Sequence, residues 1–131
     1  MLRMLSTERT KSEFLPISAQ SATSANLTDA DLDNSNLSNS NLTSANLSGS
    51  NLTNALLNGA NLHNTNFGAA TLVKANLTGA ILTGTNLKNA NLTGATLTGA
   101  TLSGDTWNNT ICPDGTNSNS DGGTCLQHLT P

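Results

Sequence analysis

Large hydrophobic residues occur at every fifth position from Leu27 to Trp107, in 17 successive units without a break. Fifteen of these positions hold Leu. The residue two before each large residue is Ala in 11 units, Ser or Thr in five, and Asp105 in the last. Side chains two apart lie on one face of an extended chain. Each unit therefore turns one small and one large side chain inward and its Asn and Thr outward. An α-helix does not fit, because a step of five residues turns by roughly 140° and leaves no apolar stripe.

The odd period also predicts a bend in every unit, because a straight strand would turn the next Leu to the opposite face. The residue two after each large residue is Gly or Asn in 13 of the 17 units. These residues tolerate the positive φ that the third position of a type II turn requires. Short extended pieces that always bend in the same direction wind into a solenoid, whose repeats bury a core only by stacking on their neighbours.

The tandem pattern Ala-(Asp/Asn)-Leu-x-x, unbroken over residues 25–109, resembles the pentapeptide-repeat protein family. The resemblance implies an all-β fold: a right-handed, four-sided β-helix with four pentapeptides in each coil and about four coils in the array. Residues 20 apart would then stack. One core column would contain Leu27, Leu47, Phe67, Leu87 and Trp107, with Trp107 sealing the last coil.

We expect one domain in three parts: an N-terminal tail or short capping helix (1–24), the repeat array (25–109) and a C-terminal capping tail (110–131). The segment Thr10–Glu13 has the spacing of a capping box, and Pro16 would end a helix that begins there. Such a helix would lay Phe14 and Leu15 over the first coil. The polar stretch that follows, Ser18–Ser24, is equally typical of a disordered tail.

The composition excludes several classes of protein. Only 10% of residues are charged, the net charge is −3, and aromatic residues make up 2%. A surface this neutral is not a nucleic-acid footprint, and no apolar run approaches the 18 residues of a membrane span. The first ten residues lack the apolar core of a signal peptide. The array itself has a charge of −2, from Asp29, Asp31, Asp33 and Asp105 against Lys74 and Lys88.

The tail after Trp107 holds both cysteines, Cys112 and Cys125, which flank a loop rich in Gly, Asn and Ser. This arrangement favours one disulfide, worth roughly 3 kcal/mol in the chain-entropy model. The bridge would pin the tail over the last coil, and its apolar residues would form the cover: Ile111, Leu126 and Leu129. The tail also resembles that of some bacterial, notably cyanobacterial, members of the family. This resemblance and the paired cysteines favour an extracytoplasmic compartment, periplasm or thylakoid lumen, over the cytoplasm.

Three other chemistries are weaker alternatives for the tail. Cys112, Cys125 and His128 would give zinc only three ligands, at a spacing that matches no common structural site. Cys125 with His128 would make a nucleophile and base, but nothing else marks an active site. Asn117, Asn119 and Asp121 partly match a Ca²⁺ loop, whose twelfth position would be His128 instead of Glu.

Several outward residues invite a functional interpretation that the repeat explains better. Asp29, Asp31 and Asp33 form a solvated acidic edge rather than a cation site, and His63 has no acid or Cys near it in sequence. The outward Asn residues are expected to hydrogen-bond in ladders between coils. Outward apolar residues fall on three different sides, so they form no patch: Leu56, Val73 and Ile81.

No motif supports catalysis or a cofactor, so we expect no enzyme and no metal. The favoured function is a structural or protein-interaction module with an unknown protein partner, as a monomer. The family resemblance offers an alternative, mimicry of DNA to bind DNA gyrase, but that needs dense negative charge. A remote alternative is ice binding by Thr arrays. No side keeps Thr on every coil, however, and the outward Thr residues are scattered: Thr71, Thr96, Thr98 and Thr101.

Overall fold

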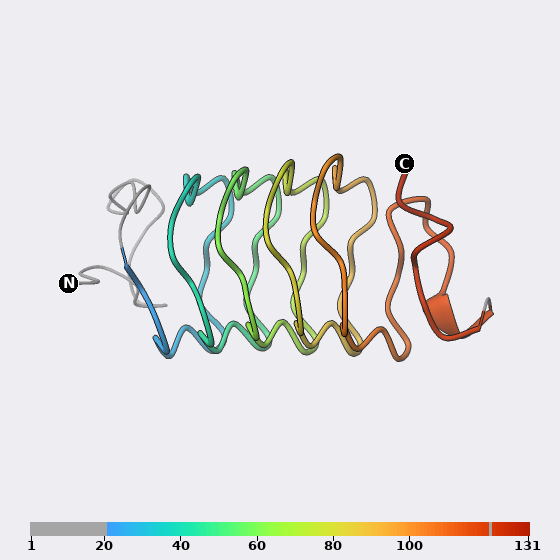
Figure 1. The fold of residues 1–131 in the computed structure, drawn as a ribbon, viewed down its shortest axis with the longest axis horizontal. Helices are drawn as coiled ribbons and strands as arrows, with labels where there is room; N and C mark the ends of the chain where they lie inside the picture. The colour runs from blue at the N-terminus through green and yellow to red at the C-terminus, as the bar shows by residue number, and fades with distance from the viewer. Residues whose placement is uncertain (1–20, 121) are drawn as a thin grey trace.

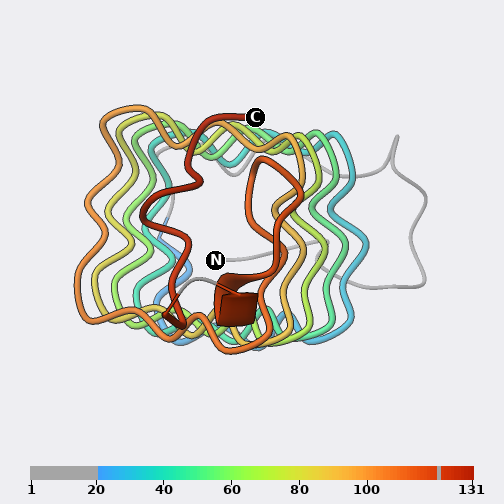
Figure 2. The same ribbon diagram turned by 90° about the vertical axis from the view of Figure 1, so that its right-hand side faces the viewer.

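The computed structural model describes residues 21–120 and 122–131, and these form a rod of stacked coils with an irregular tail at one end (Figure 1). Viewed along the rod, each coil has four sides (Figure 2). The sides are joined by isolated β-bridges rather than by continuous strands. One short 3-10 helix, η2 (Ser118–Ser120), lies in the described part of the tail. The N-terminal tail or helix expected over residues 1–24 falls mostly on residues 1–20, outside the described residues.

Fifteen parallel bridges set the register, and each joins residues 20 apart. The N–H groups of Leu77 and Gly79 donate to the carbonyls of Thr96 and Thr98 in the next coil, at 2.8 and 2.9 Å. The N–H of Thr96 donates back to the carbonyl of Ala75 at 2.9 Å. Four pentapeptides therefore make one turn of the coil. We name each side after its first large inward residue, as the Leu27, Leu32, Leu37 and Leu42 sides.

Each corner is a tight turn, closed by a hydrogen bond such as that from the Ala80 N–H to the Leu77 carbonyl, 3.0 Å long. The third turn residue has a positive φ in every unit from Ser24 to Asn109, as the pattern of Gly and Asn predicts. Ala69 and Lys74 hold this left-handed conformation, each with φ of 57°, without the short polar side chain of the Asn, Asp and Ser residues at the other non-glycine corners. An L-residue pays roughly 1–2 kcal/mol there, so these two corners are strained.

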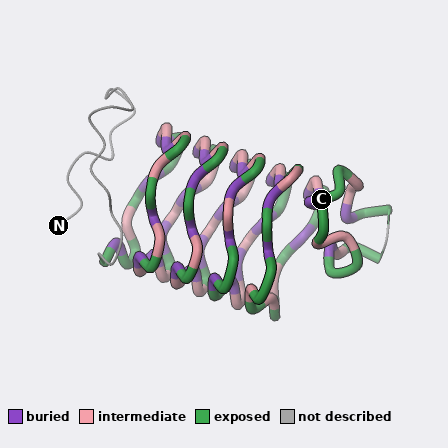
Figure 3. The backbone as a smooth tube through the Cα atoms, turned by 90° about the horizontal axis from the view of Figure 1, so that it is seen from above, coloured by how far each residue is buried: buried purple, intermediate pink, exposed green. Residues whose placement is uncertain are grey.

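The core is a narrow stack of the inward residues, which appear as the buried bands of Figure 3. Four columns of Leu run along the rod, and the Ala, Ser and Thr two residues before them fill the space between. Phe67 is fully buried, and Trp107, at the last level of the same column, is 5% exposed. The Leu27 side thus carries the column expected from the 20-residue stacking, all of it buried: Leu27, Leu47, Phe67, Leu87 and Trp107.

The outward Asn residues act mainly within their own unit. Asn51 Oδ1 accepts hydrogen bonds from the Thr53 N–H at 3.2 Å and the Thr53 hydroxyl at 2.7 Å. The same contact to the backbone recurs along the rod and satisfies an N–H that points away from the neighbouring coil. The expected ladders between coils also occur. On the Leu27 side, Asn86 donates to Asn66 at 2.9 Å and Asn66 to Asn46 at 3.0 Å.

Candidate interaction surfaces and the capped end

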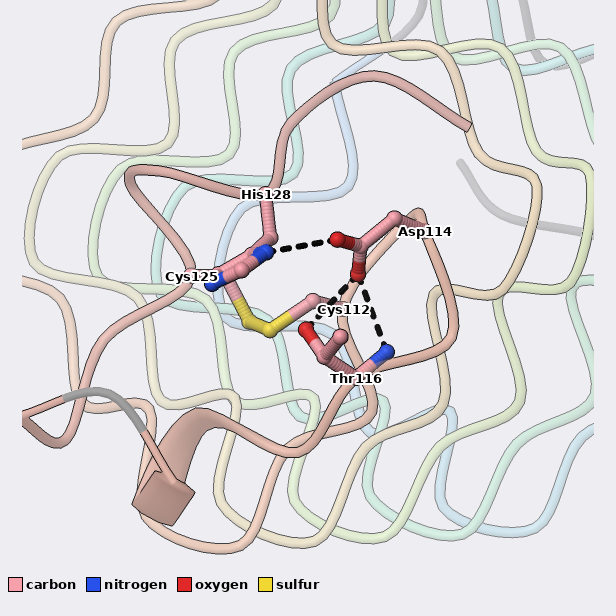
Figure 4. A network of polar contacts seen from close by, with 5 residues as sticks. All are labelled: Cys112, Asp114, Thr116, Cys125 and His128. Carbon is pink, nitrogen blue, oxygen red and sulfur yellow. Dashed lines mark hydrogen bonds and ion pairs between the residues drawn. A yellow bond between two sulfur atoms is a disulfide. The ribbon is translucent and has the colours of Figure 1, made fainter.

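The tail is attached to the rod by a disulfide between Cys112 and Cys125, with Cα atoms 5.4 Å apart (Figure 4). Both residues are fully buried. Cys112 takes the next inward position after Leu92 in the column of the Leu32 side, since the Leu92 N–H donates to the Ile111 carbonyl at 2.8 Å. The bridge therefore ties residues 113–131 to the base of a core column.

Polar contacts beside the disulfide hold two parts of the tail together (Figure 4). Asp114 Oδ1 accepts from the Thr116 N–H at 2.9 Å and the Thr116 hydroxyl at 2.7 Å. Asp114 Oδ2 lies 2.5 Å from Nδ1 of His128. The Thr116 donors, first the N–H and then the hydroxyl, hold the pKa of Asp114 below its ordinary value, and His128 adds to the effect. Sequence reasoning missed this pair, which is separated by 14 residues.

The chain reverses direction between the two cysteines. The Gly115 N–H donates to the Cys112 carbonyl at 2.9 Å, and Asn117 pairs with Ile111 in an antiparallel bridge. The returning segment is bonded to the buried Thr110, whose carbonyl accepts a hydrogen bond from the Ser118 N–H at 2.9 Å. The tail thus folds back on the Leu32 side instead of starting another coil.

The apolar cover of this end differs in part from the expectation. Leu129 is partly buried and packs on the core, and Ile111 is also partly buried. Leu126 was predicted to join them, but it is 52% exposed, so that prediction is wrong. Leu126 directly follows the buried Cys125, and this position turns its side chain toward solvent.

The geometry assigns structural roles to the residues considered for metal binding or catalysis. The sulfur atoms of Cys112 and Cys125 are joined to each other, which leaves no thiolate for zinc or for nucleophilic attack. Asn119 Oδ1 accepts from the Asn109 N–H at 2.9 Å, and Asn117 donates to the Asn109 side chain at 2.9 Å. Within residues 21–120 and 122–131, no three His, Cys, Asp or Glu residues are grouped to hold a metal ion.

The outward charged residues of the coils lie on the Leu32 side or on its two corners. The 20-residue register places the acids on the first coil and the lysines two to three coils further along, roughly 10–15 Å at the usual spacing of adjacent chains. The set consists of Asp29, Asp31, Asp33, Lys74 and Lys88. The Leu37 and Leu42 sides display Asn, Ser and Thr, with His63, Leu56 (41% exposed) and Ile81 (42% exposed) separated on them.

Asp105 stands where other units place an inward Ala, Ser or Thr. Its Oδ1 accepts from the N–H and the hydroxyl of Thr85 at 2.9 and 3.0 Å. Its Oδ2 is buried and has no hydrogen-bond partner among the described residues. Burial, the largest influence, raises the pKa of Asp105 above its ordinary value, while the bonds from Thr85 oppose that shift.

The repeats and the coil identify the class of protein. The sequence matches the family model described as pentapeptide repeats (8 copies) twice, over residues 23–59 and 60–99. The chain therefore belongs to the pentapeptide repeat family, and its fold is the right-handed quadrilateral β-helix of that family. No curated protein matches the chain. In the described residues, no helix is long and apolar enough to cross a membrane.

Solved structures of the family are similar to this chain. The pentapeptide repeat protein Rfr23 from the cyanobacterium Cyanothece is 42% identical over 61% of this chain and 58% of its own, with a TM-score of 0.48. A pentapeptide repeat protein from the Arabidopsis thaliana thylakoid lumen is 30% identical over 66% of this chain and 64% of its own, with a TM-score of 0.55. HetL from Nostoc, involved in heterocyst differentiation regulation, is 33% identical over 78% of this chain and 55% of its own, with a TM-score of 0.44. The chain thus spans less than two thirds of each of these relatives.

Proposed function

We propose that the protein is a non-catalytic interaction module whose Leu32 side docks a partner protein. The distribution of charge carries this proposal. All five outward charged residues of the coils lie on one side and its corners, although each coil offers outward positions on four sides; the sixth charged residue, Asp105, points inward. A partner that presents basic groups to the first coil and acidic groups to the third and fourth coils would be complementary to this surface.

Lys74 supports the same surface. It is exposed, it occupies a turn position with φ of 57°, and most units place Gly or Asn there. Its side chain passes Gly94 of the next coil, where an added Cβ would lie 3.3 Å from Lys74 Cγ. A strained conformation at an exposed position is a recurrent feature of functional sites. We infer that Lys74 is kept for the charge that it presents.

The charge pattern favours docking to a partner with complementary charges over binding to gyrase by DNA mimicry. A DNA mimic needs negative charge along its whole length, since DNA carries one charge per about 1.7 Å. Here the acids of the Leu32 side occupy one coil, and lysines follow them. Ice binding would require one regular Thr surface, and the exposed Leu56 and Ile81 interrupt the outward rows of the Leu37 and Leu42 sides.

An extracytoplasmic location belongs to the same proposal. Its supports are the disulfide between Cys112 and Cys125, a bond typical of oxidising compartments, and the similarity to a protein of the thylakoid lumen. The free-thiol content of the protein, alkylated as the source cells are lysed, tests this. Blocked thiols are expected, and two free thiols would place the protein in a reducing compartment.

Site-specific photocrosslinking in the source cells tests the docking side. A photoreactive residue at position 71, on the Leu32 side, should give one discrete adduct. The matched control at position 81, on the Leu42 side, should give none. The double variant Lys74→Glu/Lys88→Glu should lose the adduct, because it makes the whole side acidic. Absence of an adduct from position 71, or equal adducts from both positions, would contradict the proposal.

A further inference from the structure

The last coil has an unpaired backbone edge on two of its four sides. One coil earlier, the N–H groups of Leu82 and Gly84 donate to the carbonyls of Thr101 and Ser103, as those of Leu77 and Gly79 do to the coil below. Their counterparts 20 residues later have no hydrogen-bond partner among the described residues. The groups concerned are the N–H of Leu97, Gly99, Leu102 and Gly104 and the carbonyls of Ala95 and Ala100.

The path of the tail explains which half of the coil is left open. Residues 106–113 continue the coil on the Leu27 and Leu32 sides, where the Leu87 N–H donates to Thr106 and the Gly94 N–H to Pro113, each at 2.8 Å. The chain then turns back at Gly115 and is fixed by the disulfide. Beyond Gly115 the described residues of the tail make no backbone hydrogen bond to the Leu37 and Leu42 sides. In the end-on view the tail crosses the open end of the coil (Figure 2).

This edge lacks the features that usually prevent strand pairing. Natural edge strands are protected by Lys, Pro, bulges or inward charges. Residues 95–104 contain no charged residue and no Pro, and the outward Thr96, Thr98, Thr101 and Ser103 are exposed. The edge also has an apolar inner border, because Ala100 and Leu102 are only partly buried. The combination is typical of a sheet edge that accepts an added strand.

We propose that the edge formed by residues 95–104 binds an extended segment of a partner protein by strand addition. The free groups of each side, two N–H and one C=O, match the backbone of an extended chain in the register that the preceding coils already use. Because the edge is neutral, the segment is uncharged, and it turns small or apolar residues toward Leu102. A second rod is a poorer occupant, since the tail projects beyond this end (Figure 1). This inference rests on the proposed interaction function and adds a second contact surface to the Leu32 side.

An NMR titration of the full ¹⁵N-labelled chain tests the proposal with a defined probe. The probe is a capped synthetic peptide that copies residues 94–104, the segment that lies beneath residues 75–84 in the rod. We expect saturable shifts and slowed amide exchange at Leu97, Gly99, Leu102 and Gly104. The matched control is the same peptide N-methylated at the positions that copy Thr96 and Thr101, which cannot donate to Ala95 and Ala100. The affinity of this control peptide should be lower by about tenfold or more, as expected for the loss of backbone hydrogen bonds.

A protein variant provides an independent control. Ala100→Lys places a charge at the inner border of the edge and should weaken peptide binding by about tenfold, whereas Thr78→Lys, outward on the coil above, should not. No shifts at millimolar peptide, or shifts centred on the Leu32 side, would overturn the proposal. Concentration-dependent shifts at Leu97 and Gly99 without peptide would assign the edge to a second copy instead. Failure here with crosslinking intact at position 71 would remove only the strand-addition site and leave the proposed function standing.

Discussion

Replacing Asp105 with Thr is expected to stabilise the protein at neutral pH. Oδ2 of Asp105 is buried without a partner, and an unsatisfied buried acceptor costs about 1–3 kcal/mol. Other inward Thr residues show what Thr would do at this position. Thr65 and Thr110 donate to the carbonyl 23 residues earlier, at 2.8 and 2.7 Å. A Thr at position 105 would reach the Leu82 carbonyl in the same way.

The substitution also removes the two hydrogen bonds from Thr85 to the carboxylate. The N–H of Thr85 keeps its bond to the Leu82 carbonyl at 2.9 Å, and its hydroxyl becomes free to donate to the preceding coil. The new bonds therefore offset the lost ones, and relief of the buried acceptor dominates. We expect a net gain of about 1–2 kcal/mol, or a rise in Tm of roughly 3–8 °C.

The pH dependence distinguishes this explanation from a general improvement in packing. Burial raises the pKa of Asp105 above 3.8, so the folded state holds its proton more tightly than the unfolded state. The wild-type protein therefore has its full stability below pH 3.8 and loses part of it as the pH rises through the folded-state pKa. Denaturation followed by Trp107 fluorescence at pH 7 and pH 3 is the assay. An advantage of Asp105→Thr that is equal at both pH values, or a loss of stability at pH 7, would refute the reasoning.

Three further predictions concern the tail and one strained corner. The double variant Cys112→Ala/Cys125→Ala should lose about 3 kcal/mol of unfolding free energy, measured in urea against the wild type; an unchanged midpoint would show that the bridge does not stabilise the fold. Ala69→Gly should raise the unfolding free energy by about 1 kcal/mol, because glycine adopts the positive φ of this corner without strain; a lower Tm would contradict the assigned strain. Asp114→Asn should loosen the tail at pH 7, seen as faster amide exchange at His128. Because the pKa of Asp114 is lowered, its contribution is present above pH 3.8 and disappears as the pH falls through the folded-state pKa, so variant and wild type should converge in acid.

The repeat made much of the fold predictable. A period of five with one small and one large residue fixes which side chains turn inward, and Gly or Asn at the third turn position fixes where the chain bends. The number of sides did not follow from that reasoning, because a turn in every unit defines only a regular polygon. Stacking at a spacing of 20 came from the family resemblance, and the bridges have this spacing.

The tail was harder to predict, because no period constrains it. Cys112 and Cys125 could be paired from their spacing, but nothing in the sequence indicated that Leu126 would face solvent or that His128 would meet Asp114. The open edge at residues 95–104 was missed for the same reason, since it depends on where the tail reverses. The Asn residues show a further limit: Asn at an outward position fits both a ladder and a contact to its own unit, and the backbone favours the second.

The central claim is that the coil repeats every 20 residues and ends with two sides unpaired. Amide hydrogen exchange of the free protein tests it directly, because the chain contains its own controls. We expect slow exchange at Leu77, Gly79, Leu82 and Gly84, whose N–H groups are bonded to the next coil, and fast exchange at the residues 20 later. Equal protection at Leu97 and Leu77 would contradict it, since it would mean that another segment already pairs with the last coil.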